Sequence, residues 1–452
     1  FALESREPIT NFDFVTFTLQ YELSYTNILN ILDLANIPIL KEERTLEDPF
    51  IMVGGPCAYN SEPLADFVDV VILGEGEEVN LEVVNEYKEW KKNKTTREDF
   101  LYKISSIEGV YIPSFYDVKY NEDGTVQSVT PNREGITKNP TKRIIKDVET
   151  VDYPEKLIVP YIDTVHDRIV LELFRGCTRG CRFCQAGMIY RPVREKTKED
   201  LLDLTRELIK NTGYEEVSLS SLSTCDYSDI KGLVDDLMNE HEEKRVGVAL
   251  PSIRVDAFSV DILKSIQKVR KTGLTFAPEA GSQRMRDVIN KGLTEERILE
   301  AAKNAFESGW STIKLYFILG VPYETVEDAA EIGLLAEKIA DQYFAVPKHI
   351  RNKGLRITVS TSILVPKPFT PFQWAPMARI EDVNQKINAV KDSIKSKCIV
   401  YNYHEQKTSV MESVFARGDR RLCDVLIKAF EKGARFDGWN QYFKYDIWQE
   451  SL

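Results

Sequence analysis

The sequence predicts an α/β protein: a partial parallel (β/α)6 TIM-like barrel, preceded by an incomplete Rossmann-like domain and followed by a helical C-terminal extension. Two observations predict this class. Apolar runs with strand character alternate with segments of helical periodicity along most of the chain, as in parallel sheets covered by helices. Glycine-rich turns follow several of these strands, at the point where each would meet the next helix. The 452 residues suffice for several domains, each with its own core.

Residues 1–105 predict the later half of a doubly wound, Rossmann-like sheet. Its expected elements are strands at Phe14–Leu19, Phe50–Val53 and Val68–Leu73, and helices at Tyr25–Asn36 and from Glu77 to about Lys92. The turns Gly54-Gly55-Pro56 and Gly74-Glu75-Gly76 end two of the strands. The chain begins at Phe1 without a methionine, so we expect the natural protein to begin upstream.

The rest of the chain divides into three predicted segments. Residues 106–165 combine short β runs, a hairpin signal at Glu122-Asp123-Gly124 and scattered prolines, which indicates a linker with small β elements. Residues 166–366 carry the barrel, with strands expected near 169–175, 216–221, 246–250, 273–277, 312–319 and 356–363. Residues 367–452 begin with a proline-rich stretch, after which we expect helices to the C-terminus.

Charge and cysteine usage narrow the functional class. With 71 acidic and 59 basic residues the net charge is -12, so nothing supports a surface that holds nucleic acid by phosphate neutralisation. No apolar run approaches the length of about 20 residues that spans a bilayer. Three of the seven cysteines fall within eight residues, a spacing that indicates metal binding by reduced thiols and not a disulfide framework. We therefore expect a soluble cytoplasmic protein with no membrane segment.

Cys177, Cys181 and Cys184 form a C-x3-C-x2-C pattern directly after the first barrel strand. The active-site residues of such barrels lie at the carboxyl ends of the strands. Thiolates are the usual ligands of iron-sulfur clusters, and three of them leave one iron of a four-iron cluster without a protein thiolate. The alternative is a structural zinc site completed by a distant ligand such as Cys225 or His166, although such sites usually show two closely spaced cysteine pairs.

The segment from Arg175 to Gly187 resembles the signature loop of the radical S-adenosylmethionine superfamily. The resemblance implies that Cys177, Cys181 and Cys184 hold a 4Fe-4S cluster. It further implies that the open iron chelates S-adenosylmethionine, which is split to methionine and a 5'-deoxyadenosyl radical. Phe183 matches the aromatic residue whose backbone contacts the adenine.

Later strand ends resemble the family's cofactor contacts. Ser220 and Ser221 stand where the family contacts the methionine amino group, with serines in place of the customary Gly-Gly-Glu. An ordinary serine-rich turn is the alternative. The resemblance places Arg254 at the cofactor carboxylate, and Glu279 or Ser282 at the ribose. An ion pair of Arg254 with Asp256 or Glu279 is an equal alternative.

Two further segments complete the predicted barrel. Gly320 ends the strand that resembles the family's adenine-contacting strand, and Thr325 is a good helix N-cap. Arg284, Arg286 and Lys291 lie on the preceding predicted helix and are expected to be solvated.

The turns at Gly54 and Gly74 resemble the cobalamin-binding-type domain that precedes many of these enzymes. Classical members supply a histidine ligand, but the first histidine here is His166, outside that domain. Cobalamin binding therefore stays open. The tail segments Leu364–Trp374, Arg417–Arg421 and Phe436–Trp439 resemble an uncharacterised subfamily with the same upstream domain. The arginines of the second tail segment, Arg417, Arg420 and Arg421, could bind an anionic substrate or form an ion-pair network with Asp419.

The expected function is radical chemistry on an unidentified small-molecule or macromolecular substrate, with methyl or methylthio transfer as one outcome. The competing hypothesis is an iron-sulfur redox-sensing or electron-transfer module that does not turn over S-adenosylmethionine. The resemblance also implies a reducing partner such as flavodoxin or ferredoxin.

Overall fold

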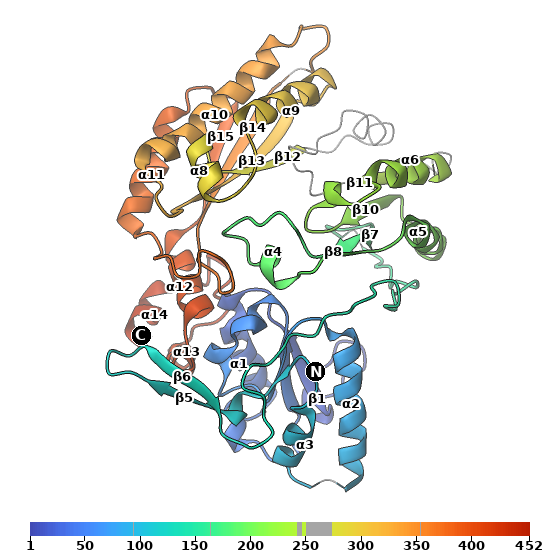
Figure 1. Cartoon of the computed structure of the whole chain (residues 1–452), viewed down its shortest axis with the longest axis vertical. Coiled ribbons are helices and arrows are strands. Elements are labelled where there is room, and N and C mark those ends of the chain that lie inside the picture. The colour runs from blue at the N-terminus through green and yellow to red at the C-terminus, as the bar shows by residue number, and fades with distance from the viewer. Residues whose placement is uncertain (94, 163, 242–245, 250–273, 353) are drawn as a thin grey trace. The chain divides into compact units, whose positions relative to one another are not determined.

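The computed structural model describes residues 1–93, 95–162, 164–241, 246–249, 274–352 and 354–452. The chain divides into two compact units (Figure 1). One combines Phe1–Ile145 with Lys407–Leu452, and the other is Lys146–Gln406. Among the helices that the structure describes, none combines the length and apolar character that a membrane crossing requires.

The first unit is built on a four-stranded sheet of order β1-β2-β3-β4. Its strands are β1 (Phe14–Thr18), β2 (Phe50–Gly54), β3 (Val70–Ile72) and β4 (Val110–Tyr111). The first three strands are parallel, as an α/β sheet requires, and β4 is antiparallel. The predicted hairpin also forms, from β5 (Tyr116–Tyr120) and β6 (Val126–Pro131).

Helices cover both faces of this sheet. The surrounding helices are α1 (Tyr25–Leu34), α2 (Gly76–Asn93), α3 (Arg97–Ile104), α12 (Gln406–Arg417), α13 (Leu422–Glu431) and α14 (Tyr445–Ser451). One core joins the sheet to α2 and α3, and a second joins it to α1 and to the C-terminal helices. Met411, Phe415 and Trp448 are at most 1% exposed in that second core. The last part of the chain therefore completes the fold of the first part.

The second unit contains two parallel sheets, with the strand orders β11-β10-β7 and β12-β13-β14-β15. Their strands are β7 (Ile169–Glu172), β10 (Glu216–Ser220), β11 (Gly247–Ala249), β12 (Leu274–Glu279), β13 (Thr312–Leu319), β14 (Arg356–Ile363) and β15 (Ile399–Tyr403). A short antiparallel pair, β8 (Phe174–Arg175) and β9 (Arg194–Glu195), follows β7. Six of the parallel strands were predicted, close to their observed bounds.

The strand β15 corrects the expectation that only helices follow the proline-rich stretch. It pairs with β14 over Ile399–Tyr403 at the edge of its sheet. Ile399 is its only buried residue, and Val400 and Tyr403 are exposed. An edge strand buries little of its surface, and the apolar run that marks this one, Cys398–Tyr401, is only four residues long and has polar residues on both sides.

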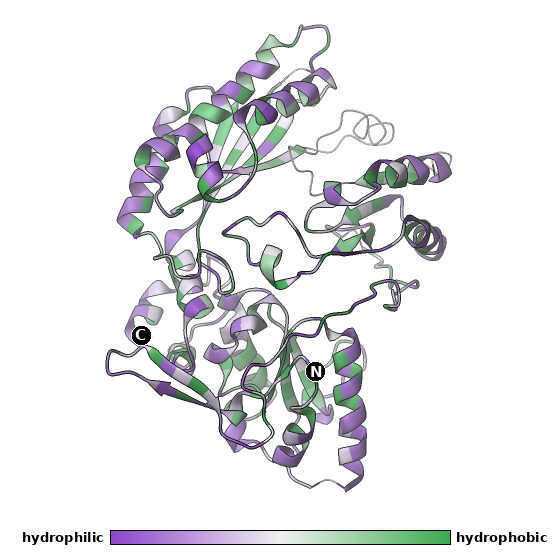
Figure 2. Ribbon diagram, viewed as in Figure 1, coloured by the Kyte–Doolittle hydropathy of each residue, from purple (hydrophilic) through white to green (hydrophobic). Residues whose placement is uncertain are grey.

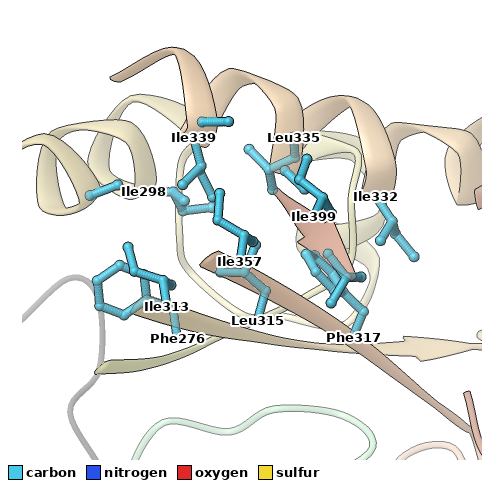
Figure 3. Close-up of a cluster of buried hydrophobic side chains, with 14 of the residues drawn as sticks. Phe276, Ile298, Ile313, Leu315, Phe317, Ile332, Leu335, Ile339, Ile357 and Ile399 are labelled. Atoms are coloured by element: carbon cyan, nitrogen blue, oxygen red, sulfur yellow. The ribbon is translucent and has the colours of Figure 1, made fainter. Parts of the chain in front are cut away.

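Helices follow nearly every parallel strand of the second unit. They are α4 (Ala186–Ile189), α5 (Lys198–Thr212), α6 (Ile230–His241), α8 (Gln283–Val288), α9 (Glu295–Glu307), α10 (Val326–Ala345) and α11 (Ile380–Ser393). In Figure 3, Ile332, Leu335 and Ile339 of α10 point toward the sheet that carries Leu315 and Ile357. Figure 2 shows mostly hydrophobic strands beside helices with hydrophilic outer sides. These buried layers hold the strand ends, and the loops after them, in fixed positions.

Candidate functional site

The three clustered cysteines lie on the loop between β8 and α4. Cys177 follows β8 by two residues, and Cys184 precedes α4 by two. All three thiols are free, Cys181 is buried, and the other two are partly exposed. The loop therefore lies where the sequence predicted it, after the first parallel strand of this unit.

The backbone before Cys177 can be made only by glycine. Gly176 has φ +91°, and a β-carbon there would lie 2.5 Å from the carbonyl oxygen of Pro192. L side chains rarely adopt such a backbone conformation, and the contact leaves no space for one. Arg191 then donates from Nε to the carbonyl of Cys177 at 3.2 Å. These contacts fix the direction in which the loop leaves the strand.

One side of the loop is tied to the segment after β10. Arg179, between the first two cysteines, donates from Nε to Oδ2 of Asp226 at 2.7 Å and from a second nitrogen to Oδ1. Ser223 donates to the same carboxylate at 2.6 Å. A bidentate arginine-carboxylate pair fixes orientation as well as distance. The serine-rich turn and the cysteine loop are thus held together.

The other side of the loop is tied to the end of α8 and to the residues that follow it. The backbone N–H of Arg182 donates to the carbonyl of Ile289 at 2.9 Å, and its guanidinium donates to the carbonyls of Asp287 and Val288. Asn290 donates to the carbonyl of Gly180 at 3.0 Å. The loop is therefore held from both sides.

The thiol of Cys184 has a raised pKa. Burial raises the pKa of Cys184, and Cys181, Cys177 and Glu279 raise it further. The backbone N–H of Gly187 donates to the Cys184 sulfur at 3.4 Å, which acts in the opposite direction. Three free thiols on one rigid loop are a donor set that suits a cluster with one iron lacking a protein thiolate.

Within the described residues, no group of three His, Cys, Asp or Glu side chains could hold a single metal ion. A cubane cluster does not need three side chains around a single ion, because each thiolate binds a different iron.

Glu279 is the last residue of β12 and lies in the left-handed region, with φ +68°. Its carboxylate lies 3.2 Å from the ammonium of Lys291, and both side chains are largely buried. Ser282, the other predicted ribose contact, caps α8 by accepting from the N–H of Met285 and donates to Asp328. Its hydroxyl is therefore already engaged within the fold.

The other predicted contacts are spread over neighbouring loops. Ser220 ends β10, and Ser221 donates to the hydroxyl of Thr224 at 3.1 Å. Phe183 is partly buried against a small apolar cluster that includes Ile289 and Ile318. Arg254 lies outside the described residues.

Gly320 donates its N–H to Glu324 at 2.7 Å. Glu324 is 2% exposed and forms an ion pair of 2.9 Å with Lys386 of α11. The turn after β13 is therefore held by a buried ion pair that the sequence reasoning missed, because the lysine lies 62 positions further along the chain.

The expectation of a solvated helix after β12 was wrong. Arg286 is fully buried and donates to the carbonyls of Ala280, Gly281 and Leu293. Arg284 pairs with Asp328, and Lys291 pairs with Glu279. Their partners lie on backbone turns or in distant segments, so no local charge pattern could have indicated them.

Two of the C-terminal arginines form ion pairs, and for Arg421 the partner is Asp419, as one of the two alternatives predicted. Arg420 pairs with Glu62 at 2.9 Å, and Arg421 pairs with Asp419 at 2.7 Å.

Two family descriptions match this chain. The one named "Radical SAM proteins, N-terminal" matches residues 1–113, and "Radical SAM superfamily" matches residues 171–336. An uncharacterised protein of Methanocaldococcus jannaschii is 32% identical over 94% of this chain and 82% of its own length. The chain belongs to the radical S-adenosylmethionine superfamily. It is therefore an enzyme, and the superfamily uses a 4Fe-4S cluster and S-adenosylmethionine.

More distant relatives agree on the fold. An uncharacterised methyltransferase of Pyrococcus horikoshii is 22% identical over 66% of this radical SAM chain and 60% of its own length. TsrM from Kitasatospora setae, solved with cobalamin and a 4Fe-4S cluster bound, has a TM-score of 0.50 at 13% identity, covering 80% of this chain and 66% of TsrM. OxsB, solved with aqua-cobalamin and S-adenosylmethionine, has a TM-score of 0.50 at 11% identity, covering 92% of this chain and 58% of OxsB. The radical SAM chain thus spans less than two thirds of these three relatives.

Proposed function

We propose that Cys177, Cys181 and Cys184 hold the 4Fe-4S cluster of this radical SAM enzyme. The observation that carries the proposal is the loop itself: three free thiols lie between the Arg179–Asp226 pair on one side and the contacts to residues 287–290 on the other. A loop fixed from both sides holds its thiols in position before the cluster is assembled.

S-adenosylmethionine would lie over the strand ends beside this loop. The residues assigned to it are Phe183, Ser220, Ser221, Arg254, Glu279, Ser282 and Gly320. Among the described residues, Glu279 has the strongest support, because it ends β12 with φ +68° and its carboxylate is paired with Lys291 at 3.2 Å. When bound, the reduced cluster supplies the electron that splits S-adenosylmethionine into methionine and a 5'-deoxyadenosyl radical.

The two parallel sheets would form one partial barrel. Their strands follow chain order from β7 to β11 and from β12 to β15. A junction between β11 and β12 would create a seven-stranded open barrel with the cysteine loop after its first strand.

The proposed net reaction is methyl or methylthio transfer to a substrate that the sequence does not identify. Support comes from relatives with those activities in their names: the methyltransferase of P. horikoshii, and a tRNA-2-methylthio-N(6)-dimethylallyladenosine synthase of Desulforamulus reducens, 26% identical over 39% of this chain. An electron donor such as flavodoxin or ferredoxin would reduce the cluster.

The turn at Gly74, which resembles that of the cobalamin-binding-type domain, packs against the chain's own backbone. At Gly74, a β-carbon would lie 2.2 Å from the carbonyl oxygen of Arg143, whose backbone pairs with the turn as a parallel bridge. Glu75 accepts from the N–H of Ile145, so the start of α2 is also engaged. All four histidines of the chain lie after residue 145. The first unit therefore supplies no histidine ligand for cobalamin, and no step is derived through it.

The test is anaerobic reconstitution with iron and sulfide, followed by dithionite reduction with S-adenosylmethionine and assay for 5'-deoxyadenosine. Wild type should form the product, and Cys181→Ala should bind less iron and form none. Cys398→Ala is the matched control, because that thiol lies beside β15 and should not affect product formation. If the cluster forms but its spectrum does not change when S-adenosylmethionine is added, and no cleavage occurs, an electron-transfer or sensing role becomes the better account.

A further inference from the structure

A cavity of about 350 Å³ lies in the second unit, between α5 and the segment 149–155 that precedes β7. Small-molecule sites start at about 300 Å³ and combine apolar walls with a few placed polar groups. Val151, Tyr153 and Leu204 supply apolar surface to this cavity. The cavity is therefore large enough for a metabolite of the size of an amino acid.

Lys196 is the buried charge of this cavity. The residue is 6% exposed and directly precedes Thr197, the N-cap of α5. Its ammonium lies 5.3 Å from the centre of the Tyr153 ring and forms no ion pair or hydrogen bond within the part of the chain that the structure describes. A buried ammonium is costly when no anion compensates its charge. An anionic group of a ligand at this position would supply that compensation.

The backbone around Lys196 is fixed by the sheet. Its N–H donates to the carbonyl of Leu173 at 2.9 Å, and its carbonyl accepts from the hydroxyl of Tyr227 at 2.9 Å. The hydroxyl of Tyr153 donates to the carbonyl of Val170 on β7. The lysine and the aromatic ring beside it are thus both attached to the sheet, so the cavity is formed before a ligand binds.

Six carboxylates line the same cavity: Glu149, Asp152, Glu155, Asp200, Asp203 and Glu207. Three of them are engaged within the chain. Glu149 accepts from the N–H of Thr197 at 2.9 Å. Asp203 pairs with Arg206, and Glu207 pairs with Lys210 at 3.0 Å. The other three are exposed, and their side chains form no ion pair or hydrogen bond with described residues. The cavity therefore combines one buried ammonium with carboxylates that remain available at its exposed edge.

The charges of this cavity restrict the class of ligand. Nowhere in the described ranges do three His, Cys, Asp or Glu side chains come together in a way that could hold a metal ion. A wholly cationic ligand would leave the ammonium of Lys196 without an anion, and a wholly anionic one would meet six carboxylates. A ligand that carries one charge of each sign satisfies both parts of the cavity.

We propose that this cavity binds a small zwitterion of the α-amino acid type. The carboxylate of the ligand contacts the ammonium of Lys196, and its amino group contacts the available carboxylates at the edge. An apolar side chain of the ligand lies against Val151 and Leu204. This site goes beyond the proposed function, since it uses none of the residues assigned to the cluster or to S-adenosylmethionine.

The test is isothermal titration calorimetry of the reconstituted enzyme with three probes that share one carbon chain. They are L-norleucine, hexanoate, which lacks the amino group, and pentylamine, which lacks the carboxylate. The cluster is left unreduced and S-adenosylmethionine is present in excess, so that the probes do not enter the cofactor's own site.

Three variants accompany the wild type. Lys196→Met removes the ammonium at similar volume. Asp152→Asn combined with Glu155→Gln removes two exposed carboxylates and breaks no ion pair or hydrogen bond of the described chain. Lys303→Met is the matched control, because Lys303 lies on α9, outside the cavity, and its side chain is 54% exposed. Circular dichroism shows whether each variant is folded.

We expect L-norleucine to bind the wild type with a Kd below about 1 mM, and hexanoate and pentylamine to bind at least about tenfold more weakly. Lys196→Met should raise the Kd for L-norleucine at least about tenfold, because the carboxylate of the probe loses a charged partner. The combined Asp152 and Glu155 variant should also raise it, through the amino group. Lys303→Met should match the wild type.

Three results would overturn the proposal. The first is that none of the probes binds the wild type at about 1 mM. The second is that pentylamine binds as tightly as L-norleucine, which would mean that the cavity attracts any cation. The third is that L-norleucine binds both altered proteins as tightly as the wild type. The exposed carboxylates and the three probes decide the question even if Lys196→Met does not fold.

Discussion

Arg179 and Asp226 form a bidentate ion pair that joins the cysteine loop to the turn after β10, with 2.7 Å between Nε and Oδ2. The arginine lies between Cys177 and Cys181, so any movement of the pair moves the loop. Both side chains are partly buried, at 34% and 20% exposure, which weakens screening by solvent.

The first prediction concerns this pair. Arg179→Gln should make the reconstituted cluster several times more sensitive to removal by an iron chelator, because the loop loses one of its two attachments. Asp226→Asn should have a similar effect. The cluster of the double variant should be removed little faster than that of either single variant. The measurement is the rate of cluster bleaching in the presence of chelator.

Arg206→Gln is the control for this prediction. Arg206 forms a comparable bidentate pair with Glu240 on the outer helices. If both arginine variants bleach at the same rate, the attachment of the loop has no special role.

The second prediction concerns the buried pair Glu324–Lys386. Lys386→Met should lower the free energy of unfolding by about 3–5 kcal/mol, since it leaves a buried carboxylate without its partner. The double variant Glu324→Gln with Lys386→Met should lose clearly less free energy of unfolding than Lys386→Met alone. Urea unfolding of the apoprotein measures both. Additive costs would mean that the two side chains do not act as a pair.

The third prediction is a pH dependence that originates from Asp328. Burial acts to raise its pKa, but hydrogen bonds from Arg284, Thr325 and Ser282 outweigh burial and lower the pKa from 3.8 to about 2. Because the folded pKa lies below the unfolded one, the carboxylate stabilises the fold above about pH 4, and this contribution disappears as the pH falls toward 2.

Asp328→Asn should therefore lower the free energy of unfolding by about 2 kcal/mol near neutral pH, and by less in acid. The check is the difference in urea midpoint between wild-type and variant apoprotein at pH 7, 4 and 3. A difference that does not narrow below pH 4 would contradict the assignment.

The fourth prediction separates steric overlap from backbone strain. Gly74 and Gly213 both have positive φ, but only Gly74 faces a close neighbour, the carbonyl of Arg143. Gly74→Ala should destabilise the protein by about 3 kcal/mol or more, and Gly213→Ala by about 1 kcal/mol. Thermal unfolding of the two variants measures the difference. Equal losses would show that the chain near Arg143 moves aside readily.

Most of the strands and the cysteine loop could be predicted from the sequence because their signals are local. Apolar runs such as Ile313–Leu319 and the spacing of Cys177, Cys181 and Cys184 are each contained in a few residues. The edge strand β15 has a weaker local signal, the four apolar residues Cys398–Tyr401, and the sequence reasoning missed it because the run is short and stands among predicted helices.

The supporting residues of the site escaped prediction for a different reason. Lys291, Asp226 and Lys386 look like ordinary surface charges in the sequence. Only the fold shows that each lies beside an opposite charge from a separate segment. The turn at Gly74 is a further case, because its glycine-rich sequence gives no sign that the backbone of Arg143 lies against it.

The packing of Phe415 and Trp448 into the core around α1 has a consequence for biosynthesis. The first strands leave the ribosome long before these aromatic side chains exist, so one face of their sheet stays uncovered while residues 146–406 are made. That middle stretch is continuous and contains its own buried clusters. The sheet of the first unit is therefore synthesised before residues 146–406 and completes its folding only after them, and until then its open apolar face is a natural target for chaperones.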